Sequence, residues 1–203
     1  MRPPSGGAVL GLVGNAASGK DFIASIFTEQ HGFVHYSGSD IVREAIGERG
    51  LQLSRELQTA VANELREQHG GDYFAKESLH RARQLAPDTG RILLSGIYAP
   101  AEGAFITEDC GGSLINVSAS ELPGTNDARI RYDRLAARND GPRDNLNVAA
   151  FFAAYERENS GMTDKQANVT TLATMAKHTI VNGPTTTRQQ LDNQIDDILK
   201  GIQ

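Results

Sequence analysis

The segment G-N-A-A-S-G-K-D, from Gly14 to Asp21, has the residue types and spacing of a phosphate-binding loop. Gly14 and Gly19 permit backbone conformations that turn successive N–H groups toward one anion, and a helix after the loop would add its positive dipole end. Lys20 supplies an ammonium for the β- and γ-phosphates of a nucleotide. We therefore predict a nucleotide-binding loop rather than a fortuitous glycine turn. Its predicted cofactor-binding residues are Gly14, Asn15, Ala16, Ala17, Ser18, Gly19, Lys20 and Asp21.

The last position of the loop departs from the pattern G-x-x-x-x-G-K-[ST], because Asp21 stands where a hydroxyl usually holds Mg²⁺. A bare carboxylate beside phosphates would repel them. A magnesium ion removes this repulsion, and it keeps several waters that a carboxylate can accept hydrogen bonds from. We predict that Asp21 is an inner- or outer-sphere partner of Mg²⁺ and takes part in catalysis. The alternative is that Asp21 caps a helix or pairs with a neighbouring charge.

Strands and helices alternate along the chain on either side of this loop. The expected strands span residues 8–13, 32–36, 91–95, 112–118 and 178–181. The expected helices span residues 20–30, 41–48, 55–68, 73–85, 102–107, 165–175 and 187–202, with Asp40, Ser54 and Asp72 as caps of the second, third and fourth. Because parallel strands need crossover connections, we predict an α/β fold with a five-stranded parallel sheet flanked by helices.

Unusual sequence follows directly after each expected strand. Ligands of parallel α/β sheets bind beyond the carboxyl ends of the strands, so one crevice is expected to gather these segments. They are residues 14–21, 37–43, 95–98, 118–143 and 182–183.

Length and composition are those of one globular domain: the chain has 203 residues, of which 39% are hydrophobic. A formal net charge of -5 argues against a protein that coats DNA or RNA. No apolar run approaches the roughly 20 residues that a membrane helix needs. We expect a cytoplasmic protein without nucleic-acid or membrane partners, with one domain at 8–203 behind a flexible N-terminus at 1–7.

Cysteine and histidine give no sign of a metal site. Cys110 is the single cysteine, so an intrachain disulfide is impossible and a cysteine-based metal cage is not expected. The histidines lack metal-ligand spacing, and each is expected at the surface or at a helix end. They are His31, His35, His69, His80 and His178.

Several short motifs follow the loop in a characteristic order. They are S-D-I-V-R (39–43), E-L-R-E-Q-H-G-G (64–71), S-G-I-Y (95–98), P-A-E (100–102), D-R-L-A-A-R (133–138), E-R-E (156–158) and V-N-G (181–183). With these motifs the chain resembles the nucleoside monophosphate kinase group of P-loop proteins from Val9 to Leu199. It is most similar to the archaeal-type nucleotide kinases described as dephospho-CoA-kinase-like or adenylate-kinase-like.

The resemblance implies ATP as donor, Mg²⁺, a helical acceptor-binding insert at about 40–86 and a lid at about 128–160. It places Asp40 and Arg43 in the acceptor site, where the guanidinium would hold an anionic group. In similar kinases the first lid arginine, here Arg134, packs on adenine, and the second, here Arg138, reaches the phosphates as a catalytic group. The loop Asn182-Gly183 would follow the edge of the adenine.

The same region holds further basic residues: Arg129, Arg131, Arg143 and Arg157. Of these we predict Arg143 and Arg157 as acceptor-binding, together with Gly96 and Tyr98. Three alternatives remain open. These four arginines and the pair Arg134 and Arg138 can be solvated helix residues, Arg43 can be one too, and Asn182-Gly183 can be a simple strand-to-helix turn.

The chain departs from its relatives at Ser95-Gly96-Ile97-Tyr98, where they usually carry D-G-x-R. The missing aspartate would order magnesium water, a loss for which Asp21 would compensate, and the missing arginine would grip the acceptor. Tyr98 can stack on a base or donate a hydrogen bond, but it cannot neutralise a phosphate.

The resulting expectation is an ATP-dependent kinase for a small nucleotide acceptor, working as a monomer or homodimer. The favoured acceptor is a nucleoside or deoxynucleoside monophosphate, and the alternative is a dephospho-CoA-kinase-like activity. An alternative of another class is a catalytically weakened nucleotide-binding regulatory protein, which would bind ATP and release no ADP.

Overall fold

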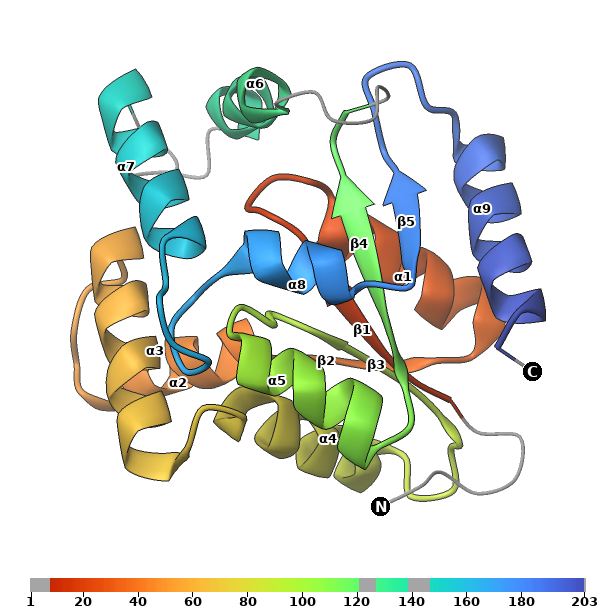
Figure 1. The fold of residues 1–203 in the computed structure, drawn as a ribbon, viewed down its shortest axis with the longest axis horizontal. Coiled ribbons are helices and arrows are strands. Elements are labelled where there is room, and N and C mark those ends of the chain that lie inside the picture. The colour runs from red at the N-terminus through yellow and green to blue at the C-terminus, as the bar shows by residue number, and fades with distance from the viewer. Residues whose placement is uncertain (1–7, 121–126, 139–146, 203) are drawn as a thin grey trace.

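The computed structural model of the chain describes residues 8–120, 127–138 and 147–202 (Figure 1). Its strands form one five-stranded parallel sheet in the order β2-β3-β1-β4-β5, which confirms the predicted fold class. The strands are β1 (Ala8–Val13), β2 (Val34–Ser37), β3 (Arg91–Ser95), β4 (Ser113–Ser118) and β5 (His178–Val181). The predicted flexible segment 1–7 and the predicted acceptor-binding Arg143 lie outside the described residues.

Helices cover both faces of this sheet (Figure 1). They are α1 (Lys20–His31), α2 (Gly38–Glu48), α3 (Arg55–His69), α4 (Tyr73–Leu85), α5 (Pro100–Ala104), the π-helix η1 (Phe105–Asp109), α6 (Ala128–Arg138), α7 (Val148–Asn159), α8 (Val169–Met175) and α9 (Arg188–Lys200). None of the helices in the described ranges is long and apolar enough to cross a membrane.

The sheet is buried on both sides because successive side chains of a strand point to opposite faces. In β1, Leu10 and Leu12 pack in the cluster formed with α1 and α9. Val9 and Val13 pack in the cluster formed with α4, η1 and α8. This burial explains why β1 reads as a continuous apolar run, and it fixes the start of the phosphate loop at the carboxyl edge of the sheet.

Several element boundaries differ from the prediction for local reasons. The second strand begins at Val34 rather than at residue 32, because Gly32 is the left-handed C-cap of α1 (φ 66°) and its N–H donates to the Phe27 carbonyl. The helix expected at 165 begins at Val169, where the Asn168 side chain accepts from Thr171 N. The helix expected at 102 begins at Pro100 and continues as η1.

The predicted cap Asp40 is wrong, because α2 begins three residues earlier. The Ser37 hydroxyl, at the end of β2, accepts a hydrogen bond of 3.3 Å from Ser39 N, so the strand passes directly into the helix. Ser54 caps α3 as predicted, accepting from Leu57 N at 3.1 Å. Asp72 stands at the N-cap position of α4 without a side-chain capping bond.

A buried ion pair holds the helical insert to the loop after β3. The Arg66 guanidinium on α3 donates from Nε to Glu102 Oε1 on α5 over 2.8 Å, and the two side chains are 3% and 0% exposed. The second carboxylate oxygen accepts from the backbone N–H of Tyr98 at 2.7 Å and of Ala99 at 3.0 Å. The pair therefore fixes the segment in which the predicted acceptor residue Tyr98 lies.

Candidate functional site

The phosphate loop lies between β1 and α1 and needs glycine at two positions. Gly14 and Gly19 have φ values of 139° and 99°, a region that L-residues rarely adopt. A Cβ atom would lie 2.6 Å from the Val117 carbonyl oxygen at the first glycine and 2.0 Å from Asn182 Nδ2 at the second. These close approaches explain the spacing of the two glycines and shape the turn that the sequence predicts.

Lys20 begins α1 and bridges the loop. Its Nζ donates to the carbonyl oxygens of Gly14 at 2.6 Å and Asn15 at 2.9 Å. Ala17 has a left-handed φ of 63°, which is unusual for a residue with a side chain. The Ser18 hydroxyl is buried and has no hydrogen-bond partner among the described residues. The loop therefore combines strained backbone, a polar atom without a described partner and a lysine ammonium, features that suit a phosphate cradle.

A cleft of about 440 Å³ opens beside the loop at the carboxyl ends of β2 and β3. The structure brings together here many residues predicted to bind cofactor or substrate: Ala16, Ala17, Gly19, Lys20, Asp21, Asp40, Arg43, Gly96 and Tyr98. On α2 the Arg43 guanidinium donates to the Asp40 carboxylate. Asp21 is exposed in the first turn of α1.

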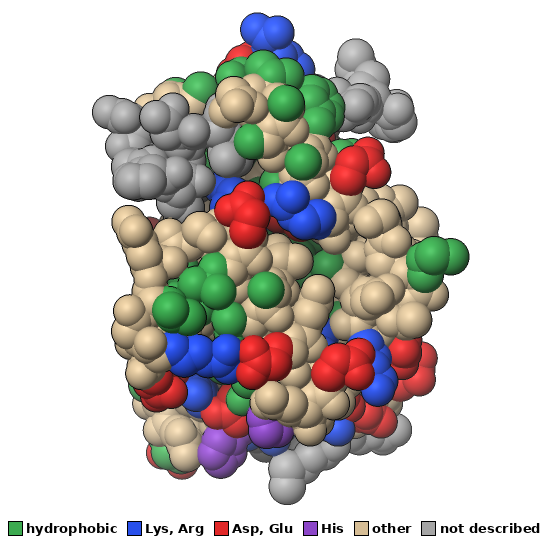
Figure 2. Space-filling view, turned by 90° about the vertical axis from the view of Figure 1, so that its left-hand side faces the viewer, with side chains coloured by type: hydrophobic (Ala, Val, Ile, Leu, Met, Phe, Trp, Pro, Cys, Tyr) green, Lys and Arg blue, Asp and Glu red, His purple; other side chains and the backbone are tan. Residues whose placement is uncertain are grey.

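A smaller cavity of about 100 Å³ adjoins the cleft between α2, α3 and α7. The predicted Arg157 lines it together with Arg55 and Arg66, which sequence reasoning did not single out. Arg157 Nη2 donates to Glu56 Oε1 over 3.3 Å, whereas its buried Nε has no hydrogen-bond partner in the described part of the chain. Figure 2 shows the side of the molecule that carries α3 and α7, where basic and acidic side chains lie next to one another.

On the other side of the loop, Arg134 connects α6 to the segment after β5. Its Nη1 contacts the carbonyl oxygens of Ala17 and Ser18 at 3.4 and 3.3 Å, and its Nη2 donates to the Asn182 carbonyl at 2.7 Å. Asn182 Nδ2 in turn donates to Ser18 O at 2.9 Å. The predicted donor-site residues are thus neighbours around the loop.

For Gly183 and Arg138, the described residues show no contact that bears on their predicted role in nucleotide binding. Gly183 N donates to Thr186 Oγ1 over 2.9 Å, as in a strand-to-helix turn. Arg138 is the last residue of α6, and its side chain lies outside the described part of the structure. Their proposed contacts with the nucleotide remain predictions.

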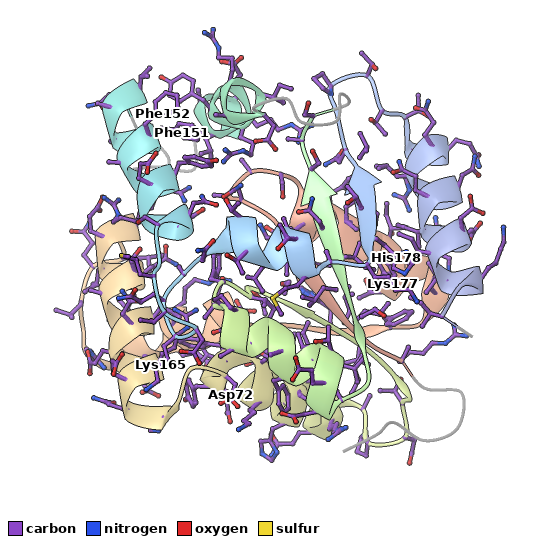
Figure 3. All side chains as sticks on the ribbon, viewed as in Figure 1. Asp72, Phe151, Phe152, Lys165, Lys177 and His178 are labelled. Atoms are coloured by element: carbon purple, nitrogen blue, oxygen red, sulfur yellow. The ribbon has the colours of Figure 1, made fainter. Side chains whose placement is uncertain are left out.

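The alternative that Arg131 is a solvated helix residue does not hold, because its side chain is only 1% exposed. Its Nε donates to Asp127 Oδ1 at 2.6 Å and its Nη1 to the Ala16 carbonyl at 3.3 Å. The guanidinium also lies 5.5 Å from the ring centroid of Phe151 and 5.0 Å from that of Tyr155. Phe151 is labelled on α7 in Figure 3. Arg131 therefore joins α6, α7 and the phosphate loop.

A further contact brings α7 onto the loop. Asn159 Nδ2 donates to Asn15 Oδ1 over 2.8 Å, and Glu158 Oε2 lies 3.4 Å from Ala16 N. The segments predicted as a lid thus lie against the loop. The sequence signal for Arg131 was available in the i,i+4 spacing of both Asp127–Arg131 and Phe151–Tyr155.

His35 lies in the cleft, although the sequence interpretation placed it at the surface or a helix end. Its Nε2 is 2.8 Å from Ser95 Oγ, the hydroxyl that stands where relatives usually carry aspartate. Burial lowers the pKa of the imidazole, while the carboxylates of Asp21 and Asp40 act in the opposite direction. Burial has the larger effect, so the net direction favours the uncharged ring.

The donor set fits Mg²⁺ bound together with a nucleotide. No group of three or more His, Cys, Asp or Glu side chains suited to a metal is found within the described ranges. Magnesium in phosphoryl-transfer sites takes one or two carboxylates and fills its remaining positions with phosphate oxygens and water. Asp21 and Asp40 are the carboxylates that line the cleft, and the role of Asp21 as a magnesium partner stays a prediction.

No family model matches the chain. It is 33% identical over 130 residues to a UPF0200/UPF0201 protein of Archaeoglobus fulgidus, covering 64% of this chain and 38% of that protein. It is 33% identical over 132 residues to a UPF0200 protein of Thermococcus gammatolerans, covering 63% and 64%. It is 32% identical over 138 residues to that of Thermococcus sibiricus, covering 66% and 70%. The chain thus spans less than two thirds of the first two relatives.

Solved kinases have the same fold. The shikimate kinase of Bacteroides thetaiotaomicron aligns with a TM-score of 0.51 at 12% identity, over 96% of this chain and 98% of that chain. The shikimate kinase of Acinetobacter baumannii, in complex with shikimate, aligns with a TM-score of 0.51 at 13% identity, over 97% of this chain and 93% of that chain. A protein of Chloroflexus aurantiacus aligns with a TM-score of 0.58 at 13% identity, over 96% of this chain and 97% of that chain. At these identities the likeness shows the fold.

Proposed function

The chain belongs to the UPF0200 family, and from this premise we propose that it transfers the γ-phosphoryl group of ATP to a nucleotide-type acceptor. One observation carries the proposal: Lys20 and the amide loop face a cleft that continues into an arginine-lined cavity. The two parts suit a donor triphosphate and an anionic acceptor. The fold, which solved kinases share, supports separate sites for a donor and an acceptor.

Phosphoryl transfer requires little covalent chemistry from the protein, because positioning and charge stabilisation supply most of the rate enhancement. The loop N–H groups and Lys20 would hold the β- and γ-phosphates, and Asp21 would hold the magnesium shell. When bound, Mg²⁺ supplies neutralisation of the charge on these phosphates. Arg43 and Arg157 would orient the acceptor, and α6 with α7 would exclude water from the cleft.

The test is incubation of the purified protein with ATP, Mg²⁺ and a panel of acceptors, with ADP release as the readout. The panel contains nucleoside monophosphates, deoxynucleoside monophosphates and dephospho-CoA. Acceptor-dependent ADP release supports the kinase proposal. ATP binding without ADP release on every acceptor would contradict it and favour the regulatory class, which the replacement of the usual aspartate and arginine at Ser95 and Tyr98 makes a real alternative.

Replacing Asp21 by alanine is expected to raise the Mg²⁺ concentration needed for half-maximal activity by about tenfold or more, because the loss of one charge-assisted contact costs about 1.5–3 kcal/mol. Titrating Mg²⁺ at saturating ATP measures this shift. Glu29→Ala, at an exposed position of α1, is the matched control and should leave the Mg²⁺ requirement unchanged. An Asp21→Ala enzyme with the parent's requirement would remove the metal role.

A further inference from the structure

We propose that His35 is the catalytic base of the reaction and that the atom phosphorylated on the acceptor is a hydroxyl oxygen. The inference rests on the proposed function and narrows it, because it separates an alcohol acceptor from a phosphate acceptor. It also gives a role to a histidine and a serine that the sequence interpretation left without one.

The first support is the position of the imidazole. His35 lies on β2 and Ser95 at the end of the paired strand β3, so the sheet itself sets their distance. Nε2 and Oγ are 2.8 Å apart, and Ser95 is only 1% exposed. A buried hydroxyl therefore orients the ring, while the ring lines the same cleft as Lys20 and Asp21.

The second support is the charge around the ring. Carboxylates face it from two helices, Asp21 on α1 and Asp40 on α2, and both favour a proton on the imidazole. Three cations line the same cleft: Lys20 on α1, Arg43 on α2 and Arg55 on α3. Burial keeps the resting ring uncharged, with its pKa below the ordinary value. Such a ring can accept a proton, and the two carboxylates then stabilise the imidazolium.

The third support is the chemistry of the acceptor. A phosphate monoester is largely ionised at neutral pH, so its oxygen attacks without losing a proton. A hydroxyl must lose its proton as the new O–P bond forms, and in protein kinases a carboxylate accepts this proton. A base positioned in the cleft is needed for an alcohol and is superfluous for a phosphate.

The step balances in atoms and charge. The acceptor oxygen forms a bond to the γ-phosphorus, and the bond from that phosphorus to the β,γ-bridging oxygen breaks. ADP leaves with the electron pair of the broken bond, and the hydroxyl proton moves to the His35 imidazole. The proton returns to solvent after the products leave.

Two acceptors separate the alternatives. Dephospho-CoA has a free ribose hydroxyl and no phosphate monoester, whereas 2′,3′-dideoxy-AMP has a phosphate monoester and no ribose hydroxyl. With ATP and Mg²⁺, we expect ADP release and a new phosphate monoester on the first acceptor and neither product on the second. Transfer to dideoxy-AMP at an equal or greater rate would overturn the inference while leaving the kinase proposal intact.

Variants test the base itself. His35→Gln keeps a hydrogen-bonding group toward Ser95 but cannot take up the proton, so kcat on the hydroxyl acceptor should fall by about 10²–10⁴-fold. Added imidazole should restore part of the activity of His35→Ala, a result that a purely structural histidine would not give. Ser95→Ala, which retains the base, should lose less activity than His35→Gln.

His80→Gln on the exposed face of α4 is the matched control and should keep the parental rate. Parental activity of His35→Gln, or the absence of imidazole rescue, would overturn the role of His35. Absence of ADP release on every acceptor would instead overturn the proposed function, and the assignment of His35 with it.

Discussion

Replacing Lys20 by alanine is expected to lower kcat for phosphoryl transfer from ATP by about 10²–10³-fold, the cost of removing one preorganised donor from a transition state. The Lys20 ammonium lies within 2.9 Å of two carbonyl oxygens of the loop, and in loops of this pattern the lysine reaches the β- and γ-phosphates. Its removal leaves the loop N–H groups and the bound Mg²⁺ to stabilise the charge. Steady-state ADP release on the best acceptor of the panel measures the loss.

The control for this variant is Lys200→Ala, which removes an ammonium on the exposed end of α9 where it pairs with Asp197. It should keep the parental kcat and KM, because it lies on a surface helix outside the cleft. Equal activity of the Lys20 variant and the parent would show that any observed ATP turnover does not use this loop.

Replacing Glu102 by alanine is expected to lower the free energy of unfolding by about 3–5 kcal/mol, the cost of removing one partner of a buried ion pair. The change leaves the Arg66 guanidinium, 3% exposed, without its carboxylate. It also removes the acceptor for the N–H groups of Tyr98 and Ala99. Urea unfolding followed by circular dichroism measures the difference between the variant and the parent.

Arg49→Ala is the matched control because it breaks an exposed pair, in which Arg49 binds Glu64 through two hydrogen bonds of 2.7 and 2.9 Å. Exposed pairs contribute little, so its unfolding curve should overlay that of the parent. A Glu102→Ala curve that also overlays the parent would show that the buried pair does not hold the insert to the loop after β3.

Much of the fold could be predicted because its signals are local. Short apolar runs bounded by glycine indicate buried parallel strands, as in β1, and Ser54 before an amphipathic stretch indicates a helix start. The phosphate loop could also be predicted, since the spacing of its glycines reflects close approaches of the loop backbone to Val117 and Asn182. Local sequence therefore predicted the loop and its place at the carboxyl edge of the sheet.

The rest of the candidate site depends on contacts between distant segments, which spacing does not reveal. His35 meets Ser95 only because β2 pairs with β3. Arg131 is buried because α6 and α7 converge on the loop, where its guanidinium lies near the rings of Phe151 and Tyr155. In the sequence both residues look like ordinary polar side chains, because their burial and their partners arise only from tertiary packing.

Isothermal titration calorimetry with ATP and Mg²⁺ is the decisive measurement, because the proposed function requires a triphosphate to bind to the amide loop and Lys20. We expect one binding site per chain in the parent and an affinity about tenfold or more lower in Lys20→Ala, because that variant loses one charge-assisted contact. No heat of binding in the parent, or the same affinity in both proteins, would contradict the proposed function.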